Sequence, residues 1–122
     1  SKLTAEYLTS SFKFYRNMRK ECSQILFKCK QKKIKNIFIF GQSELTEVLI
    51  LTSKDTYIPI SGLYIFGSNK KSFLGVKIYS FLPKRKIDKI IFCDMKGSYN
   101  TLLNLQKIVG KEKVIVPKLL NF

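Results

Sequence analysis

The first quarter of the chain carries a long amphipathic helical pattern. Its apolar residues recur at alternating steps of three and four positions, and no Gly or Pro interrupts them. This spacing predicts a single helix over residues 4–32. Its apolar stripe consists of Leu8, Phe12, Tyr15, Met18, Cys22, Ile25, Leu26 and Cys29.

Two roles are open for this helix, because its stripe is longer than one short sheet needs. The helix either folds back over one face of the sheet or associates with the same helix of a second copy, forming a homodimer. The candidate dimerisation residues are Leu8, Phe12, Tyr15, Met18, Cys22 and Ile25. We therefore divide the chain into a linking or dimerisation helix over residues 1–33 and an α/β domain over residues 34–122.

After residue 33, short apolar runs alternate with helical patterns, as expected for parallel βα units. Ile37–Phe40 and Ile90–Cys93 are apolar at every position, which is typical of central strands covered on both faces, and we expect them to lie side by side. A helix is predicted over residues 44–53. Another should begin at Ser98, which can cap it, and end at Gly110.

The remaining segments complete a small sheet. We expect a second strand over residues 57–66, a loop over 67–72, one short strand over 73–79, a charged connection over 83–88 and an edge strand over 114–116. The predicted fold class is α/β: a small Rossmann-like domain with a mostly parallel sheet of about five strands, preceded by the long helix.

The turn after the first strand departs from the dinucleotide-binding fingerprint. That fingerprint has Gly at three positions, which are here Gly41, Ser43 and Thr46. A Cβ at position 43 obstructs the approach of a pyrophosphate to the backbone. Glu44 and Glu47 add negative charge at the positive end of the helix dipole. We therefore expect a turn that packs and binds no dinucleotide, and no cofactor is predicted.

Open α/β sheets bind ligands beyond the carboxyl ends of their strands, where the strand order reverses. In this chain, the candidate ligand-binding residues of that crevice are Gly41, Gln42, Ser43, Glu44, Asp94 and Lys96. Gln42 and Ser43 can hydrogen-bond a neutral or sugar-like ligand. Asp94 and Lys96 fit a ligand site and a simple turn equally well.

Composition limits the chemistry that the chain can perform. With no His among 122 residues, His-dependent metal sites, Ser-His-Asp triads and Cys-His dyads are excluded. Three cysteines, Cys22, Cys29 and Cys93, lie in apolar or helical contexts, which fits reduced thiols in a core. No general base accompanies Cys93, so we assign no catalytic residue and no metal site.

The chain carries 23 Lys and Arg against 8 Asp and Glu, a net charge of +15. Such a charge attracts nucleic acids and acidic partners. Only three of the cations are Arg, the better base reader, and the Lys clusters at residues 28–35, 70–71 and 84–89 contain no interleaved stacking residues. We therefore favour solvated surfaces over direct DNA contact.

Nothing in the sequence predicts membrane insertion or secretion. No apolar run approaches the length that spans a bilayer, and a polar helical segment follows Ser1 directly, without a signal peptide. We expect a cytoplasmic protein. The missing initiator Met suggests a trimmed chain or a fragment.

Several segments occur in an order that resembles a known family. These are the aromatic and basic helix with Phe14, Tyr15 and Arg19, the run IFIFGQSELTEVLIL, the strand that begins at Ser61, and the run KIDKIIFCD. The order resembles the C-terminal, Rossmann-like part of bacterial winged-helix (MarR-like) transcriptional regulators associated with polysaccharide genes. More distantly, it is similar to the N-terminal domains of sugar O-acetyltransferases and to CoA-binding domains.

The resemblance implies a non-catalytic, effector-sensing or dimerising domain of a transcriptional regulator. DNA would then be bound only by a domain upstream of residue 1, and the effector would be a small molecule or a sugar-type ligand. Ser43 stands where those relatives have a second Gly, and Ile65 and Phe66 stand where they have acids. The alternative is an enzyme-like domain that binds a nucleotide or nucleotide-sugar.

Overall fold

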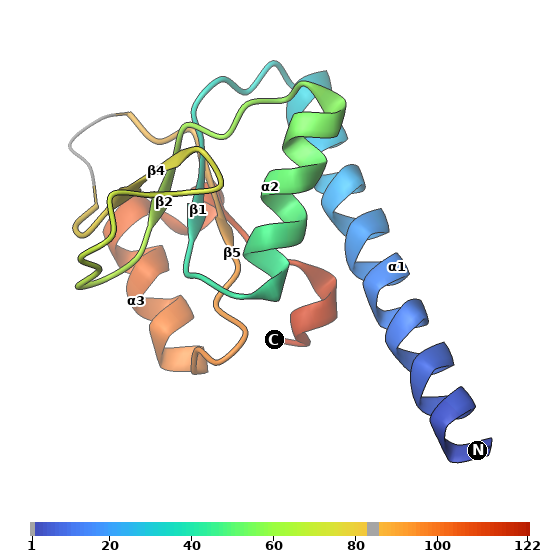
Figure 1. Cartoon of the computed structure of the whole chain (residues 1–122). Coiled ribbons are helices and arrows are strands. Elements are labelled where there is room, and N and C mark those ends of the chain that lie inside the picture. Colours follow the sequence, from blue (N-terminus) through green and yellow to red (C-terminus); the bar gives the residue numbers. More distant parts are fainter. Residues whose placement is uncertain (1, 83–85) are drawn as a thin grey trace.

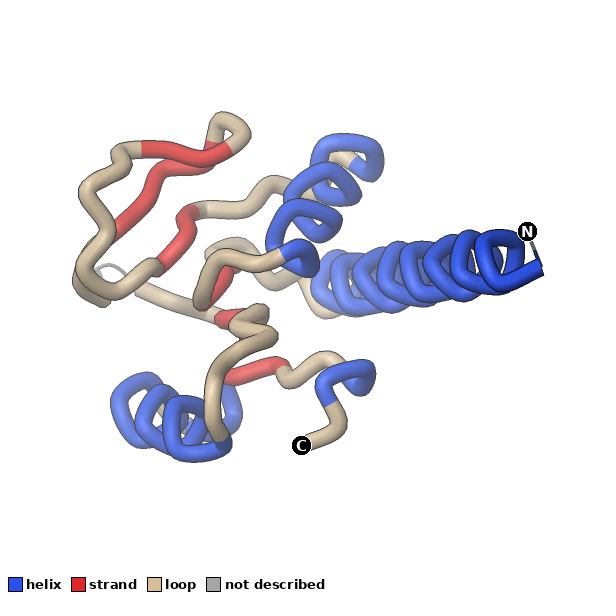
Figure 2. Tube along the Cα trace, turned by 60° about the horizontal axis from the view of Figure 1, so that its bottom comes forward, coloured by secondary structure: helices blue, strands red, loops and turns tan. Residues whose placement is uncertain are grey.

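The computed structural model describes residues 2–82 and 86–122, with side chains from residue 11 onward. Its helices are α1 (Lys2–Gln31), α2 (Glu44–Thr56) and α3 (Tyr99–Val109), with short 3-10 helices η1 (Lys111–Lys113) and η2 (Lys118–Leu120). Its strands are β1 (Ile37–Phe40), β2 (Gly62–Tyr64), β3 (Ser72–Phe73), β4 (Val76–Tyr79), β5 (Lys89–Phe92) and β6 (Val114–Ile115). Figures 1 and 2 show the sheet between α1 and α2 on one side and α3 on the other.

The six strands lie in the order β3-β4-β2-β1-β5-β6. All neighbouring strands are parallel except β3 and β4. The chain moves outward from β1 to β2 and β4, then crosses to β5 and β6 on the other side of β1. This is the order of doubly wound sheets, with the topological switch between β1 and β5. The predicted Rossmann-like α/β fold class is confirmed.

Alternate residues of the central strands enter two separate cores. Ile37 and Ile39 of β1 pack beneath α1 and α2, whereas Phe38 packs on the opposite face with Leu102 and Leu105 of α3. Both faces of β1 and β5 are therefore covered, which explains their continuously apolar sequences. The predicted adjacency of these two strands is also confirmed, since they pair along their full length.

The helix α1 passes through two environments. Met18, Cys22 and Leu26 are at most 1% exposed and lie in the core that α2 shares with the sheet. Nearer the N-terminus, Phe12 and Tyr15 are 70% and 49% exposed. Figures 1 and 2 show this end of α1 running past the edge of the sheet. The second half of the helix therefore covers one face of the sheet, and the first half extends into solvent.

Two element boundaries differ from the prediction. The helix α2 continues to Thr56, and it ends where Tyr57 adopts a left-handed backbone with φ of 57°. The predicted end at Ser53 was wrong because the exposed Lys54 and Asp55 are compatible with another helical turn. The predicted strand over residues 57–66 was too long, since β2 contains only Gly62–Tyr64.

The prediction of one strand over residues 73–79 was wrong, because this segment belongs to a β-hairpin. The antiparallel strands β3 and β4 are joined by Leu74 and Gly75, whose φ angles are 50° and 82°. Positive φ at both central positions is the geometry of a type I′ turn, whose twist matches antiparallel strands. Leu rarely adopts such a φ, so the sequence pattern did not indicate a turn there.

The C-terminal elements agree with the prediction. The helix α3 is capped by the Ser98 side chain, which accepts a hydrogen bond from the Thr101 amide, and it ends at Gly110. The strand β6 lies at the sheet edge beside β5, as expected. Within the predicted charged connection, residues 83–85 lie outside the described part of the chain. In that described part, no helix is both long and apolar enough to cross a bilayer.

Asn36 and Asp88 join the starts of the two central strands. The Asp88 carboxylate accepts hydrogen bonds from the Asn36 backbone N–H at 2.9 Å and from its side-chain amide at 3.0 Å. These bonds, the backbone one above all, lower the pKa of Asp88. The link holds β1 and β5 together at the end of the sheet opposite the switch-point crevice.

Candidate functional site

The turn between β1 and α2 requires Gly41 for packing. Gly41 has φ of 92°, and a Cβ at this position would lie 2.9 Å from the Cβ of Asp94. The residue therefore supplies both a left-handed backbone and a close approach to the segment that follows β5. The first Gly of the fingerprint is retained for these two structural reasons.

Side-chain hydroxyl groups accept hydrogen bonds from the backbone N–H groups at the start of α2. Ser43 Oγ accepts hydrogen bonds from the backbone N–H groups of Leu45 at 3.2 Å and Thr46 at 3.5 Å. Thr46 Oγ1 accepts the Ser43 N–H at 3.1 Å, which completes a capping box. The two hydroxyls donate in turn, Ser43 to the Cys93 carbonyl at 2.5 Å and Thr46 to the Gly41 carbonyl at 2.8 Å. In dinucleotide-binding Rossmann folds, the backbone N–H groups at this helix start bind the pyrophosphate. Here they donate hydrogen bonds to the Ser43 and Thr46 hydroxyls instead.

Asp94 forms a turn after β5. Its carboxylate accepts the backbone N–H of Lys96 at 3.2 Å, and its carbonyl accepts the N–H of Gly97 at 3.1 Å. The Lys96 side chain is exposed and does not line the crevice. Of the two interpretations of Asp94 and Lys96, these contacts favour the turn.

A crevice of about 580 Å³ opens at the switch point, between the carboxyl ends of the strands and α3. It is lined by Phe40, Gly41, Gln42, Tyr64, Ile65, Phe66, Leu82, Asp94, Thr101, Asn104, Leu105 and Ile108. Three of the candidate residues, Gly41, Gln42 and Asp94, therefore meet here. The position agrees with the general rule for ligand sites in open α/β sheets.

The wall of the crevice is aromatic and almost free of charge. The Phe40 ring lies 5.3 Å from that of Tyr64 and is stacked 5.4 Å from that of Phe92. Asp94 is the only Asp, Glu, Lys or Arg among the described lining residues, and the other polar groups are amides and hydroxyls. Such a surface suits an uncharged ligand with a ring and hydrogen-bonding groups, because the lining residues that the structure describes include no cation for a phosphate.

The sequence prediction missed the contribution of α3. Thr101, Asn104, Leu105 and Ile108 follow the helical spacing i, i+3, i+4 and i+7, so they share one face, and that face lines the crevice. Two polar residues within an otherwise apolar helical face are the signal that could have indicated a ligand-facing surface.

Ser43 and Glu44 do not line the crevice. Ser43 is used as the helix cap, and Glu44 lies on α2 in a different hollow, of about 450 Å³, between α1 and α2. The turn of α2 directs successive side chains about 100° apart, so residues adjacent in sequence serve different surfaces.

The three cysteines are buried free thiols, in agreement with the expected core packing. Burial raises the pKa of Cys22 to about 12, with a smaller contribution from Glu21. Burial also raises the pKa of Cys93 well above its usual value, and the Cys22 thiol adds to this shift. Because the thiolate is the nucleophilic form, Cys93 is an inert thiol at neutral pH.

Comparisons with known proteins do not assign this chain to a family. The chain matches no family model, and neither a curated protein nor a solved structure shows significant similarity to it. Residues 2–82 and 86–122 contain no group of three or more His, Cys, Asp or Glu side chains placed to hold a metal ion. The functional conclusion therefore depends on this chain's own residues and geometry.

Proposed function

We propose that this chain is a non-catalytic module of a transcriptional regulator, which dimerises through the N-terminal half of α1 and binds an uncharged effector in the switch-point crevice. DNA contact then belongs to a winged-helix domain outside these 122 residues, as the sequence resemblance implies. The nucleotide-binding alternative is disfavoured, because Ser43 and Thr46 occupy the amides that would hold a diphosphate.

One observation carries the dimer proposal. Tyr15, Cys22 and Cys29 are spaced by seven residues and lie on the same face of α1. Cys22 and Cys29 are 1% and 2% exposed, whereas Tyr15 is 49% exposed and Phe12, one turn earlier, is 70% exposed. The apolar stripe therefore continues beyond the body of the domain. Leu8 would extend it further, but its side chain lies outside the described part.

A second copy of this chain is the partner that the charges favour. Glu44 and Glu47 lie on α2 in the hollow beside α1, near Leu51, which is 46% exposed. Asp55, by contrast, is already paired with Arg19 of its own chain at 2.9 Å. The adjacent part of α1 is basic, with Lys13, Arg16, Arg19 and Lys20. In a two-fold pair, the basic aromatic segment of each copy faces the acidic α2 of the other, so the contact is self-complementary. Met18 and Cys22 stay in each copy's own core.

Sedimentation equilibrium of the double variant Phe12→Glu/Tyr15→Glu tests the dimer. We expect the wild type to dimerise in the micromolar range and the variant to dissociate with a Kd at least about a hundredfold higher, because two aromatic contacts are lost. The matched control is Asn17→Glu/Asn100→Glu, which makes the same charge change at exposed positions away from the stripe. A wild type that stays monomeric at high micromolar concentration contradicts the proposal, as does a control that dissociates equally.

The effector part of the proposal depends on Gln42 and Asn104. Both residues line the crevice, as does Phe40, so hydroxyl groups of a sugar have amide donors and acceptors there. A ligand at a hundredfold excess over its Kd stabilises the folded state by about 2.7 kcal/mol, which raises the melting temperature by several degrees.

Melting curves with free sugars and with the corresponding nucleotide-sugars test this part. We expect at least one free sugar to stabilise the wild type and the control Asn69→Ala/Asn100→Ala, but not the variant Gln42→Ala/Asn104→Ala. If no free sugar stabilises the wild type, the effector proposal fails. If a nucleotide-sugar is turned over, the enzyme-like alternative is correct.

A further inference from the structure

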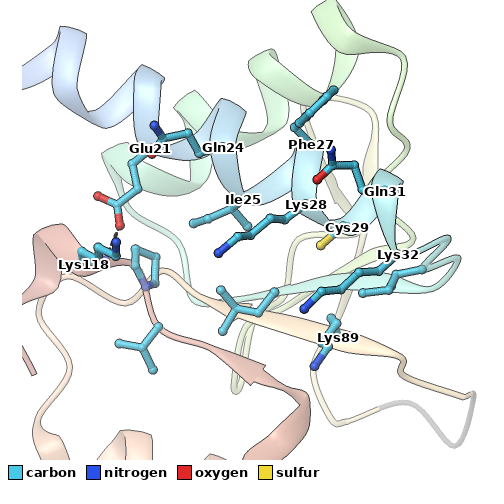
Figure 3. Close-up of a pocket in the computed structure, with 14 residues that line it drawn as sticks. Glu21, Gln24, Ile25, Phe27, Lys28, Cys29, Gln31, Lys32, Lys89 and Lys118 are labelled. Atoms are coloured by element: carbon cyan, nitrogen blue, oxygen red, sulfur yellow. Dashed lines mark hydrogen bonds between the residues drawn. The ribbon is translucent and has the colours of Figure 1, made fainter.

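A second hollow lies on the other flank of α1, away from the crevice. It is a groove of about 670 Å³ between the second half of α1 and the segment formed by β6 and η2 (Figure 3). Its apolar floor consists of Ile25, Ile34, Ile115, Val116 and Pro117. The crevice does not use these residues, and the proposed dimer contact uses the earlier part of α1, so Ile25, a candidate dimerisation residue in the sequence, lines this groove instead.

Four lysines line this groove, and three of them, all except Lys118, lie around the same hollow. Lys28 lies in the last turn of α1, Lys32 follows directly after the end of that helix, and Lys89 comes from the start of β5 on the opposite wall. Figure 3 shows the ends of all three side chains directed toward the same hollow. Lys89 Nζ donates a hydrogen bond to the Glu112 carbonyl at 2.6 Å, which fixes its position.

Among the described residues that line the groove, Glu21 is the only acid. The Glu21 carboxylate lies at the far end, where it accepts the backbone N–H groups of Lys118 and Leu119 at the start of η2. In the described part of the chain, the ion pairs are Arg19 with Asp55 and Lys86 with Asp88, so none involves the three groove lysines. Like charges that lie close together repel one another, and an anion bound between them offsets that repulsion.

The positive charges of the groove also act on the Cys29 thiol, which lines it. Burial raises the pKa of Cys29, while the charges of Lys89 and Lys32 act in the opposite direction. The two ammonium groups are therefore close enough to one point at the base of the groove to act on it together.

We propose that this groove is a binding site for a small amphipathic anion, an organic phosphate or carboxylate whose apolar part rests on the floor and whose charge lies between Lys28, Lys32 and Lys89. The volume lies within the range of small-molecule pockets, roughly 300–1,000 Å³. The concave apolar floor favours a small molecule over a nucleic acid, whose charged backbone would gain nothing from it. The inference does not depend on the dimer or on the crevice.

Isothermal titration with 2-naphthyl phosphate and its uncharged counterpart 2-naphthol tests this site. We expect the wild type to bind the phosphate at least about tenfold more tightly than 2-naphthol, since hydrogen bonds to charged groups are the stronger ones. The variant Lys28→Gln/Lys32→Gln/Lys89→Gln should lose that preference. The variant Lys28→Gln/Lys32→Gln should lose most of the preference for the phosphate. Because it keeps the Lys89 contact with Glu112, its loss of binding would not be caused by disruption of that contact.

The control Lys30→Gln/Lys71→Gln/Lys107→Gln removes the same charge from exposed positions outside the groove and outside the proposed dimer contact. The proposal requires the control to bind 2-naphthyl phosphate within about twofold of the wild type. Equal losses in both triple variants would mean that net charge alone attracts the probe, and would overturn the proposal. The proposal is also overturned if the wild type binds the two probes equally tightly. The same holds if, in a parallel titration with duplex DNA, the groove variants weaken DNA binding but leave 2-naphthyl phosphate binding unchanged.

Discussion

Replacing Leu26 with Ala is expected to lower the free energy of unfolding by about 2 to 5 kcal/mol, because a fully buried side chain leaves a cavity in a close-packed core. Leu26 is 0% exposed and packs in the core that α2 shares with the sheet, although it belongs to the N-terminal helix. Urea unfolding monitored by circular dichroism measures the change.

The neighbouring substitution Phe27→Ala is the control for this prediction. Phe27 is 58% exposed, so its truncation should cost much less than that of Leu26. Equal costs at the two positions, or no cost at Leu26, would mean that α1 is a detachable helix rather than part of the domain's core.

Replacing Gly41 with Ala is expected to destabilise the fold by about 2 to 4 kcal/mol. A left-handed backbone costs a non-Gly residue about 1–2 kcal/mol, and the new Cβ adds a steric clash. At 2.9 Å, that clash is with the Cβ of Asp94, whose turn is held by its own hydrogen bonds, so relief requires moving backbone.

Gly67→Ala separates the two contributions of the Gly41 substitution. Gly67 has φ of 70°, but a Cβ there has no atom within 4 Å, so only the backbone cost of about 1 kcal/mol remains. Denaturant midpoints compare the two variants directly. Equal destabilisation would show that Asp94 can move away from the new Cβ at little energetic cost.

The parts of the fold that the sequence predicted are those governed by local patterns. The long helix, the all-apolar central strands and the caps at Ser98 and Gly110 are each encoded within a few neighbouring residues. The hairpin at Leu74 was missed because Leu in a left-handed conformation is imposed by tertiary context and overrides local preference.

The candidate site was predicted in part, for a similar reason. Ser43 was expected to obstruct a phosphate, and the structure shows its hydroxyl bound to the amides of α2. Residues that approach one another only through the fold were not predictable from spacing. Asn104 reaches the crevice from α3, and Glu21 meets Lys118 across 97 positions of sequence.

Because α1 is continuous, a small tilt of its buried half would produce a larger displacement at its exposed N-terminal end. No Gly or Pro lies within the helix, so a tilt of its buried part would carry the part before Met18 with it as one straight segment. About 16 residues at 1.5 Å per residue give an arm of about 24 Å. A tilt of about 5° at the anchor therefore displaces the tip by about 2 Å, which is comparable to the helix shifts that switch subunit interfaces.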